Sequence, residues 1–200
     1  MLLGQRVIWP EPENLLLSRF SHVILIEEKD EYCKEEILKG KQYLEDIIGK
    51  EITAFCFPRG KFKHKHIQMV KECGFLFGRT IGYLSINKIL DKKIGLLNTT
   101  LQLVQNRRVP TYIFSAIKRC DWEGMGHIIK NIGIIDRWED FAIFLLREVI
   151  EKGGVFHLWG HSWEIEELGL WENLDKFMRE ISLLQSKLVF CTNSELWRAL

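Results

Sequence analysis

The sequence predicts an α/β fold in which strands and helices alternate within one domain. Apolar runs typical of buried strands recur along the chain, amphipathic stretches with helical spacing separate them, and glycine or proline ends most of these segments. Two hundred residues with 46% apolar content suffice for one sizeable core, so residues 1–200 are expected to form a single domain. Such alternation indicates a parallel sheet or a barrel, with active loops at the carboxyl ends of the strands.

The first half of the chain alternates clearly. Apolar positions at helical spacing end at Gly49, and the next segment is almost continuously apolar until Pro58, as in a strand covered on both faces. The predicted elements are a helix over 31–48, a strand over 52–57, a helix over 63–73 and a short strand over 75–80.

The second half begins less clearly and then regains its pattern. Asp136 and Glu139 resemble a capping box, and Gly153 with Gly154 ends the helix that follows. The predicted elements are a strand over 96–104, helix and loop over 111–132, a helix over 136–152, a strand over 155–159, a helix over 171–184, a strand over 187–191 and a short helix capped by residues 192–195.

Composition excludes several classes of partner. With 28 basic against 27 acidic residues, charge favours neither nucleic acid nor an anionic membrane. Five cysteines without a C-x-x-C spacing indicate free thiols in a reducing compartment. Because no apolar run approaches about 18 residues and no targeting segment is evident at the start, we expect a cytoplasmic protein without a membrane partner.

Two segments carry the candidate chemistry, since each places special residues directly after a predicted strand. The first is 55–60, which ends in Pro58, Arg59 and Gly60, and the second is 157–164, which contains His161. Either could also be structural, because the turn could simply end a strand and the histidine could be packed beside aromatic residues. The basic run over 61–66 is interpreted as a solvated helix start rather than a metal or nucleic-acid site.

The order and spacing of three stretches resemble the polysaccharide deacetylase family, the NodB-homology domain. They are 41–60, 70–80 with its Arg79-Thr80 end, and the late strand ending in His161-Ser162-Trp163-Glu164. The resemblance implies a seven-stranded (β/α) barrel that hydrolyses acetamides on amino sugars, with one divalent metal, zinc or similar, held by an Asp and two His. The carbohydrate is thus the implied partner.

The departures from the family concern the metal. No aspartate precedes Asp30, so the family's paired aspartates are missing, and in the His-x-x-x-His motif Ser18 replaces the first histidine while His22 keeps the second. A zinc-type site needs three protein donors, which leaves metal occupancy open. We therefore expect an incomplete barrel, truncated at its N-terminus or degenerate, whose exposed sheet edge favours a homo-oligomer.

The resemblance also implies roles for individual residues. The Arg59 backbone N–H would stabilise an oxyanion, His161 would protonate the departing amine, and His22 would bind metal. The implied substrate-binding residues are Pro58, Gly60, Arg79, Trp159, Trp163 and Glu164. Arg79 could instead form a surface ion pair, and Glu164 could orient His161 or remain solvated.

The predicted function is hydrolysis of carbon–nitrogen acetamide bonds in N-acetylated sugars, as part of carbohydrate metabolism. Because metal ligands are missing, the chain as written is expected to turn over weakly or not at all. Two alternatives stay open: a non-catalytic carbohydrate-binding descendant of the fold, and an unrelated (β/α) glycoside hydrolase that uses Glu164, Glu166 or Glu167.

Overall fold

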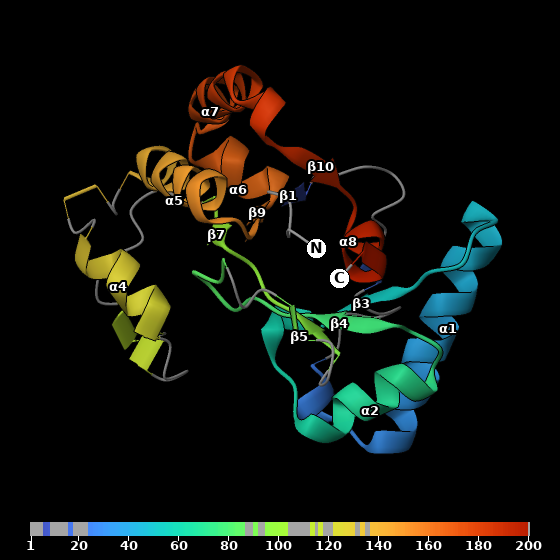
Figure 1. Ribbon diagram of the computed structural model, residues 1–200. Coiled ribbons are helices and arrows are strands. Elements are labelled where there is room, and N and C mark those ends of the chain that lie inside the picture. Colours follow the sequence, from blue (N-terminus) through green and yellow to red (C-terminus); the bar gives the residue numbers. More distant parts are fainter. Residues whose placement is uncertain are drawn as a thin grey trace. The chain divides into compact units, whose positions relative to one another are not determined.

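The computed structural model contains two compact units (Figure 1). It describes residues 6–8, 16–17, 24–86, 90–91, 95–103, 113–114, 116–117, 122–130, 133–134 and 137–199. Unit 1 contains the described residues that fall within 6–8, 82–86 and 99–191. Unit 2 contains the described residues that fall within 16–17, 24–81, 90–98 and 192–199.

Unit 2 is built on a five-stranded sheet in the order β2-β3-β4-β6-β5. The strands are β2 (Leu16–Leu17), β3 (Ala54–Cys56), β4 (Phe77–Arg79), β6 (Leu96–Leu97) and β5 (Leu90–Asp91). The first four are parallel, while β5 is antiparallel to β6, and the register places Cys56 opposite Arg79. The parallel strands follow chain order without a reversal, unlike a doubly wound sheet.

Two helices cover one face of this sheet (Figure 1). They are α1 (Asp30–Ile48) and α2 (His64–Glu72), and two 3₁₀ turns, η2 (Leu25–Glu27) and η3 (Pro58–Gly60), accompany them. Gly49 ends α1 in the left-handed conformation, with φ of 68°, as its position after the apolar pattern predicts. The aromatic side chains Phe55, Phe57 and Phe75 fill the core beneath the helices, with edge-on ring contacts at 5.3 and 5.5 Å.

The opposite face of the sheet is covered by α8 (Asn193–Ala199). Successive residues of a strand point to opposite faces of the sheet. Phe77 is paired with Ala54 rather than with Phe55, so its side chain lies on the face opposite to Phe55. There it stacks on Trp197, with the ring centroids 4.8 Å apart. The predicted cap of this helix is confirmed: the Thr192 N–H donates to Glu195 Oε2 at 2.7 Å, and the Glu195 N–H donates to Thr192 Oγ1 at 3.1 Å.

Unit 1 contains two small parallel sheets and most of the helices. The sheets are β10-β1-β8, formed by Val189–Cys191, Arg6–Ile8 and Val155–Phe156, and β7-β9, formed by Leu101–Gln102 and Leu158–Trp159. The helices are α4 (Trp122–Lys130), α5 (Trp138–Lys152), α6 (Ser162–Glu167) and α7 (Trp171–Leu183), followed by η4 (Gln185–Lys187).

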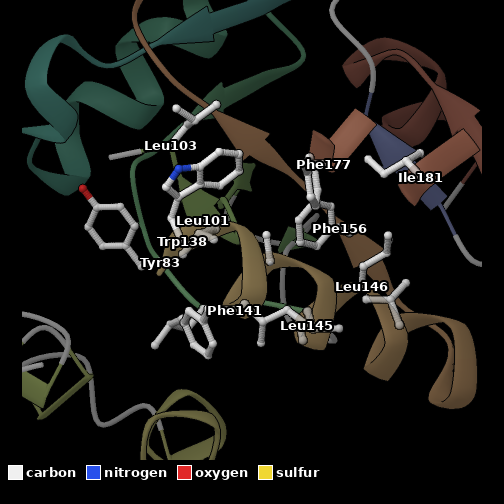
Figure 2. Close-up of a cluster of buried hydrophobic side chains, with 14 of the residues drawn as sticks. Tyr83, Leu101, Leu103, Trp138, Phe141, Leu145, Leu146, Phe156, Phe177 and Ile181 are labelled. Carbon is white, nitrogen blue, oxygen red and sulfur yellow. The ribbon is translucent and has the colours of Figure 1, made fainter. Parts of the chain in front are cut away.

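The core of unit 1 lies between α5, α7 and the strands. Figure 2 shows Trp138 and Phe141 of α5 together with Phe156 of β8 and Phe177 of α7. Trp138 meets Phe177 edge-on at 5.6 Å, and all four side chains are buried. The wide apolar stripe that predicts this helix from the sequence is therefore its core face.

Two predicted strands are each divided in the structure. The strand expected over 96–104 becomes β6 and β7, and the strand expected over 155–159 becomes β8 and β9. The cause is hydrogen bonding at the breaks: the Thr99 hydroxyl donates to Gly82 O at 2.9 Å, and the His157 carbonyl accepts from the Thr100 and Leu101 N–H groups. The prediction of one continuous strand in each case was wrong. An apolar run in the sequence does not show the residue at which a strand stops pairing with one neighbour and begins to pair with another.

The start of α5 also differs from the prediction. Arg137 is the N-cap residue and its side chain makes no capping bond, while Asp136 lies outside the described residues. Glu139 instead accepts a hydrogen bond from Asn173 Nδ2 at 2.8 Å, which ties α5 to α7.

The α/β class with parallel sheets is confirmed, and the described residues form no closed barrel. In the part of the chain that the structure describes, four cysteines form no disulfide bond: Cys33, Cys56, Cys73 and Cys191. None of the described helices is long and apolar enough to cross a membrane.

The histidine at the end of the basic run is buried, which corrects the solvated interpretation of that residue. His66 is 0% exposed, its Nδ1 accepts the Lys63 N–H at 3.1 Å, and its buried Nε2 has no hydrogen-bond partner among the described residues. Burial, followed by the charge of Lys65, lowers the pKa of His66. His64 and the lysines around it are exposed, as predicted.

We expect acid to destabilise unit 2 through His66. Because its folded pKa lies below the ordinary value of about 6.5, the unfolded chain binds this proton more tightly. The contribution to stability is complete above about pH 6.5 and is lost as pH falls below it. Urea unfolding at several pH values should show a shallower acid dependence for His66→Gln than for the wild type. The exposed His64→Gln is the control, and an equal change in both variants would contradict the assignment.

We expect Gly78→Ala to destabilise the protein by about 2 kcal/mol, because overpacking in a core costs this much. A Cβ at Gly78 would lie 2.3 Å from Cε2 of the buried Phe57 ring. Gly126 in α4 is the control: a Cβ there meets nothing within 4 Å, and alanine should gain about 1 kcal/mol of helix propensity. Urea unfolding measures both, and a neutral Gly78→Ala would show that the ring moves freely.

Candidate functional site

One group of candidate residues lies at the carboxyl edge of the unit 2 sheet. Because β3, β4 and β6 are parallel, the residues that follow them meet at one edge. These residues are the Pro58–Gly60 turn after β3, Thr80 after β4 and Asn98 after β6. The Thr80 hydroxyl donates to Asn98 Oδ1 at 2.6 Å, which joins two of the strand ends directly.

The Pro58–Gly60 turn holds an unusual backbone conformation. Arg59 has φ of 54° and ψ of 17°, a left-handed conformation that is uncommon for a residue other than glycine. Gly60, with φ of 63°, has no room for a side chain, since a Cβ would lie 2.2 Å from Cγ1 of Ile81.

Hydrogen bonds hold the turn and leave one donor available. The Phe57 N–H donates to Arg79 O at 3.1 Å, and Gly60 and Lys61 donate to the carbonyls of Phe57 and Pro58 at 2.8 and 3.1 Å. Within the described residues the Arg59 N–H donates to none, and its side chain is exposed. The turn thus presents a backbone donor of the kind that can bind an oxyanion.

Arg79 lies in the interior of unit 2 rather than in a surface ion pair. It is 3% exposed, its Nη1 donates to Asn193 Oδ1, and its Nη2 donates to Asn98 O at 3.2 Å. Burial lowers the pKa of Arg79 to about 9, so the guanidinium remains charged at neutral pH. Burial also raises the pKa of the neighbouring Cys56 thiol, with Arg79 opposing, so this thiol remains protonated and is not a nucleophile.

Another group of candidate residues lies at the carboxyl edge of the β7-β9 sheet in unit 1. The Leu103 N–H donates to Trp159 O at 2.7 Å, just after the two strands end. Gly160 follows β9, and a Cβ there would lie 3.1 Å from the Cβ of Leu103, so glycine allows the chain to turn closely into α6. His157 is buried within the strand region, in agreement with a packing role.

His161 is the N-cap residue of α6, and its ring is held between two tryptophans. It stacks on Trp163 at 5.5 Å with an interplanar angle of 16°, and it meets Trp159 edge-on at 5.5 Å. The side chain is exposed, which leaves its ring nitrogens accessible. This arrangement orients an imidazole at a strand end and suits proton transfer to a bound ligand.

Glu164 belongs to a chain of polar side chains that the sequence analysis did not identify. Its Oε2 accepts from Gln102 Nε2 at 3.4 Å, and Gln102 Oε1 accepts from the Tyr83 hydroxyl at 3.0 Å. Tyr83 and Gln102 are both buried. The available signal was Gln102 itself, a polar residue between Leu101 and Leu103 in a predicted buried strand.

The described residues do not provide a complete metal site. No group of three or more His, Cys, Asp or Glu side chains among them could hold a metal ion, and His22 lies outside the described residues. A zinc-type centre needs three protein donors, so the described set does not fit one. The predicted role of His22 stays a prediction.

The structure brings the predicted residues together in two groups. Pro58, Arg59, Gly60 and Arg79 lie at one strand edge of unit 2, and Trp159, His161, Trp163 and Glu164 lie at one strand edge of unit 1. Because the two groups belong to different units, their convergence with His22 stays a prediction.

Comparison with known proteins agrees with the motifs. Residues 20–78, which include the Pro58–Gly60 turn and most of β4, match the family model described as Polysaccharide deacetylase. The resemblance to the polysaccharide deacetylase family is confirmed. No curated protein matches the chain.

The fold also resembles a solved structure from this family. One such structure is the crystal structure of a Mycobacterium smegmatis protein that is provisionally named a polysaccharide deacetylase. It is similar to this chain with a TM-score of 0.62 and 16% sequence identity. The match covers 90% of this chain, and the chain spans 60% of the length of that protein. At this identity the likeness shows the fold alone.

Proposed function

We propose that the chain is a polysaccharide deacetylase-like hydrolase that cleaves the acetamide carbon–nitrogen bond of N-acetylated sugars. The observation that carries the proposal is the left-handed turn at Arg59, which lies inside the segment matched by the family model and presents an N–H donor at a strand edge. Backbone strain of this kind is maintained by its surroundings and clusters at functional sites.

The reaction that these residues suit is attack of water on the acetamide carbon, in which the attacking water would lose a proton to the solvent, followed by loss of the amine. The Arg59 N–H would stabilise the negative charge that develops on the carbonyl oxygen. His161 would donate a proton to the departing nitrogen as the carbon–nitrogen bond breaks, leaving acetate and a free amino sugar. Trp159 and Trp163 would hold the imidazole in place and contact the sugar, while Pro58, Gly60, Arg79 and Glu164 shape the site.

We also propose that both units are parts of one domain, an incomplete seven-stranded (β/α) barrel over residues 1–200. The parallel strands β2, β3, β4 and β6 of unit 2, which follow chain order, and the resemblance to the family support this architecture. In a barrel the carboxyl ends of the strands share one rim, which would bring the Pro58–Gly60 turn, His161 and His22 together. An incomplete barrel of this kind would have an unpaired sheet edge, which would favour a homo-oligomer.

We expect His161→Ala to reduce acetate release from an N-acetylglucosamine hexamer by about a hundredfold or more, the usual contribution of a general acid. Because turnover is expected to be weak, the assay should be sensitive and include added zinc or cobalt. The exposed His64→Ala is the matched control and should leave the rate unchanged. Acetate release that survives His161→Ala would refute the site, and hexamer binding without any acetate release would refute the hydrolase.

We expect Arg59→Gly to keep the rate within about threefold, because glycine retains the N–H donor and adopts positive φ without strain. Arg59→Pro removes the N–H and fixes φ near −65°, and it should abolish turnover. Steady-state acetate release measures both, with circular dichroism to check folding. A large loss of activity in a folded Arg59→Gly would show that the guanidinium, rather than the backbone, acts.

A further inference from the structure

An exposed aromatic surface extends along α6 and into α7, next to His161. Trp163 is 57% exposed, Trp171 48% and Leu168 45%, whereas Trp138 in the core of the same unit is buried. We define the tryptophan face as Trp163, Glu166, Glu167, Leu168 and Trp171. Exposed apolar residues that lie together commonly mark a binding surface.

The geometry of α6 places carboxylates between the two indoles. Glu166 and Glu167 follow Trp163 by three and four positions, so the three side chains share one side of the helix. Trp171 Nε1 donates to Glu166 Oε2 at 2.5 Å, which fixes the second indole beside the same carboxylate. His161 stacks on the Trp163 ring, so the tryptophan face begins at the proposed catalytic residue.

The charge of this segment contrasts with the rest of the chain. Between Lys152 and Lys176 there is no lysine or arginine, although the whole sequence has 28 basic and 27 acidic residues. The segment carries five carboxylates: Glu164, Glu166, Glu167, Glu172 and Asp175. Arg179 pairs with Asp175 at 2.8 Å, and Gln102 contacts Glu164, which leaves the negative charge concentrated beside the indoles.

We infer that the tryptophan face binds amino sugars whose nitrogen is free and protonated, so that the preferred substrate is a partly deacetylated glycan. This inference rests on the proposed function. An ammonium group over an indole gains a cation–π interaction, and beside a carboxylate it forms a charge-assisted hydrogen bond. An N-acetylated sugar gains neither, because its amide nitrogen is neutral.

The position of the face gives this preference a consequence for the reaction. A free amino sugar bound next to His161 holds a neighbouring N-acetylated sugar at the reactive position. Each deacetylation then produces the group that the tryptophan face binds, so removal of acetyl groups proceeds beside sugars that are already deacetylated.

The test compares a glucosamine hexamer with an N-acetylglucosamine hexamer by titration calorimetry at neutral pH. At low salt we expect the glucosamine hexamer to bind about tenfold more tightly, and about 1 M salt should largely remove the difference, since the screening length is then about 3 Å. The Glu166→Gln, Glu167→Gln double variant should weaken glucosamine binding about tenfold, and Trp171→Ala about fivefold. Glu167→Lys, at an exposed position, provides a charge reversal in case the double variant does not fold.

Glu151→Gln, an exposed carboxylate on α5, is the matched control and should leave both affinities unchanged. Equal affinities for the two hexamers, with acetate release intact, would overturn the inference and leave the proposed function standing. Preference for the glucosamine hexamer without acetate release would support the charged surface and contradict the proposed function. Tighter binding of an oligolysine peptide than of the glucosamine hexamer would overturn the assignment to a glycan.

Discussion

The hydroxyl of Thr100 is the constraint on which the second candidate edge depends. Thr100 is 0% exposed, its Oγ1 donates to Ser85 O at 2.9 Å and lies 3.3 Å from Val155 O, and it accepts the His157 N–H at 3.0 Å. One side chain thus lies within hydrogen-bonding distance of three backbone groups from two segments, Ser85 in one and Val155 with His157 in the other. The division of the strands, which leaves Gln102 in β7, Trp159 in β9 and His161 just after β9, agrees with this local competition with regular pairing.

Helices with a wide apolar stripe were the most predictable parts of the fold. The patterns before Gly49 and Gly153 correspond to α1 and α5, because burial of one face and a glycine stop are both local signals. The strands were harder to predict. Two apolar runs were each divided between two ladders, because strand pairing depends on segments that are distant in the sequence. The strands β1 and β2 give no clear sequence pattern, because a strand of two or three residues carries little periodicity.

The candidate site was predictable where chemistry follows a strand in the sequence. The Pro58–Gly60 turn and His161 meet that condition, and the left-handed Arg59 adds what the sequence could not reveal, because nothing in a Pro-Arg-Gly triplet requires positive φ at arginine. Tyr83 and Gln102 escaped prediction because their partnership joins segments that become neighbours only in the fold. His66 was misread for a related reason: its burial depends on packing of α2, whereas its sequence neighbours are charged.

Both candidate edges use the same structural device, a glycine beside the residue for which we propose a chemical role. Gly60 follows Arg59 and packs against Ile81, and Gly160 precedes His161 and packs against Leu103. In each case the missing side chain lets the backbone approach a neighbour closely, so the adjacent functional group is fixed by van der Waals contact. In the proposed reaction a rigid backbone at these positions would matter, because an oxyanion donor and a proton donor would both have to be in place before charge develops. The first of these close turns, after β3, lies in the segment that matches the family model, so that part of the resemblance has a physical basis in the backbone.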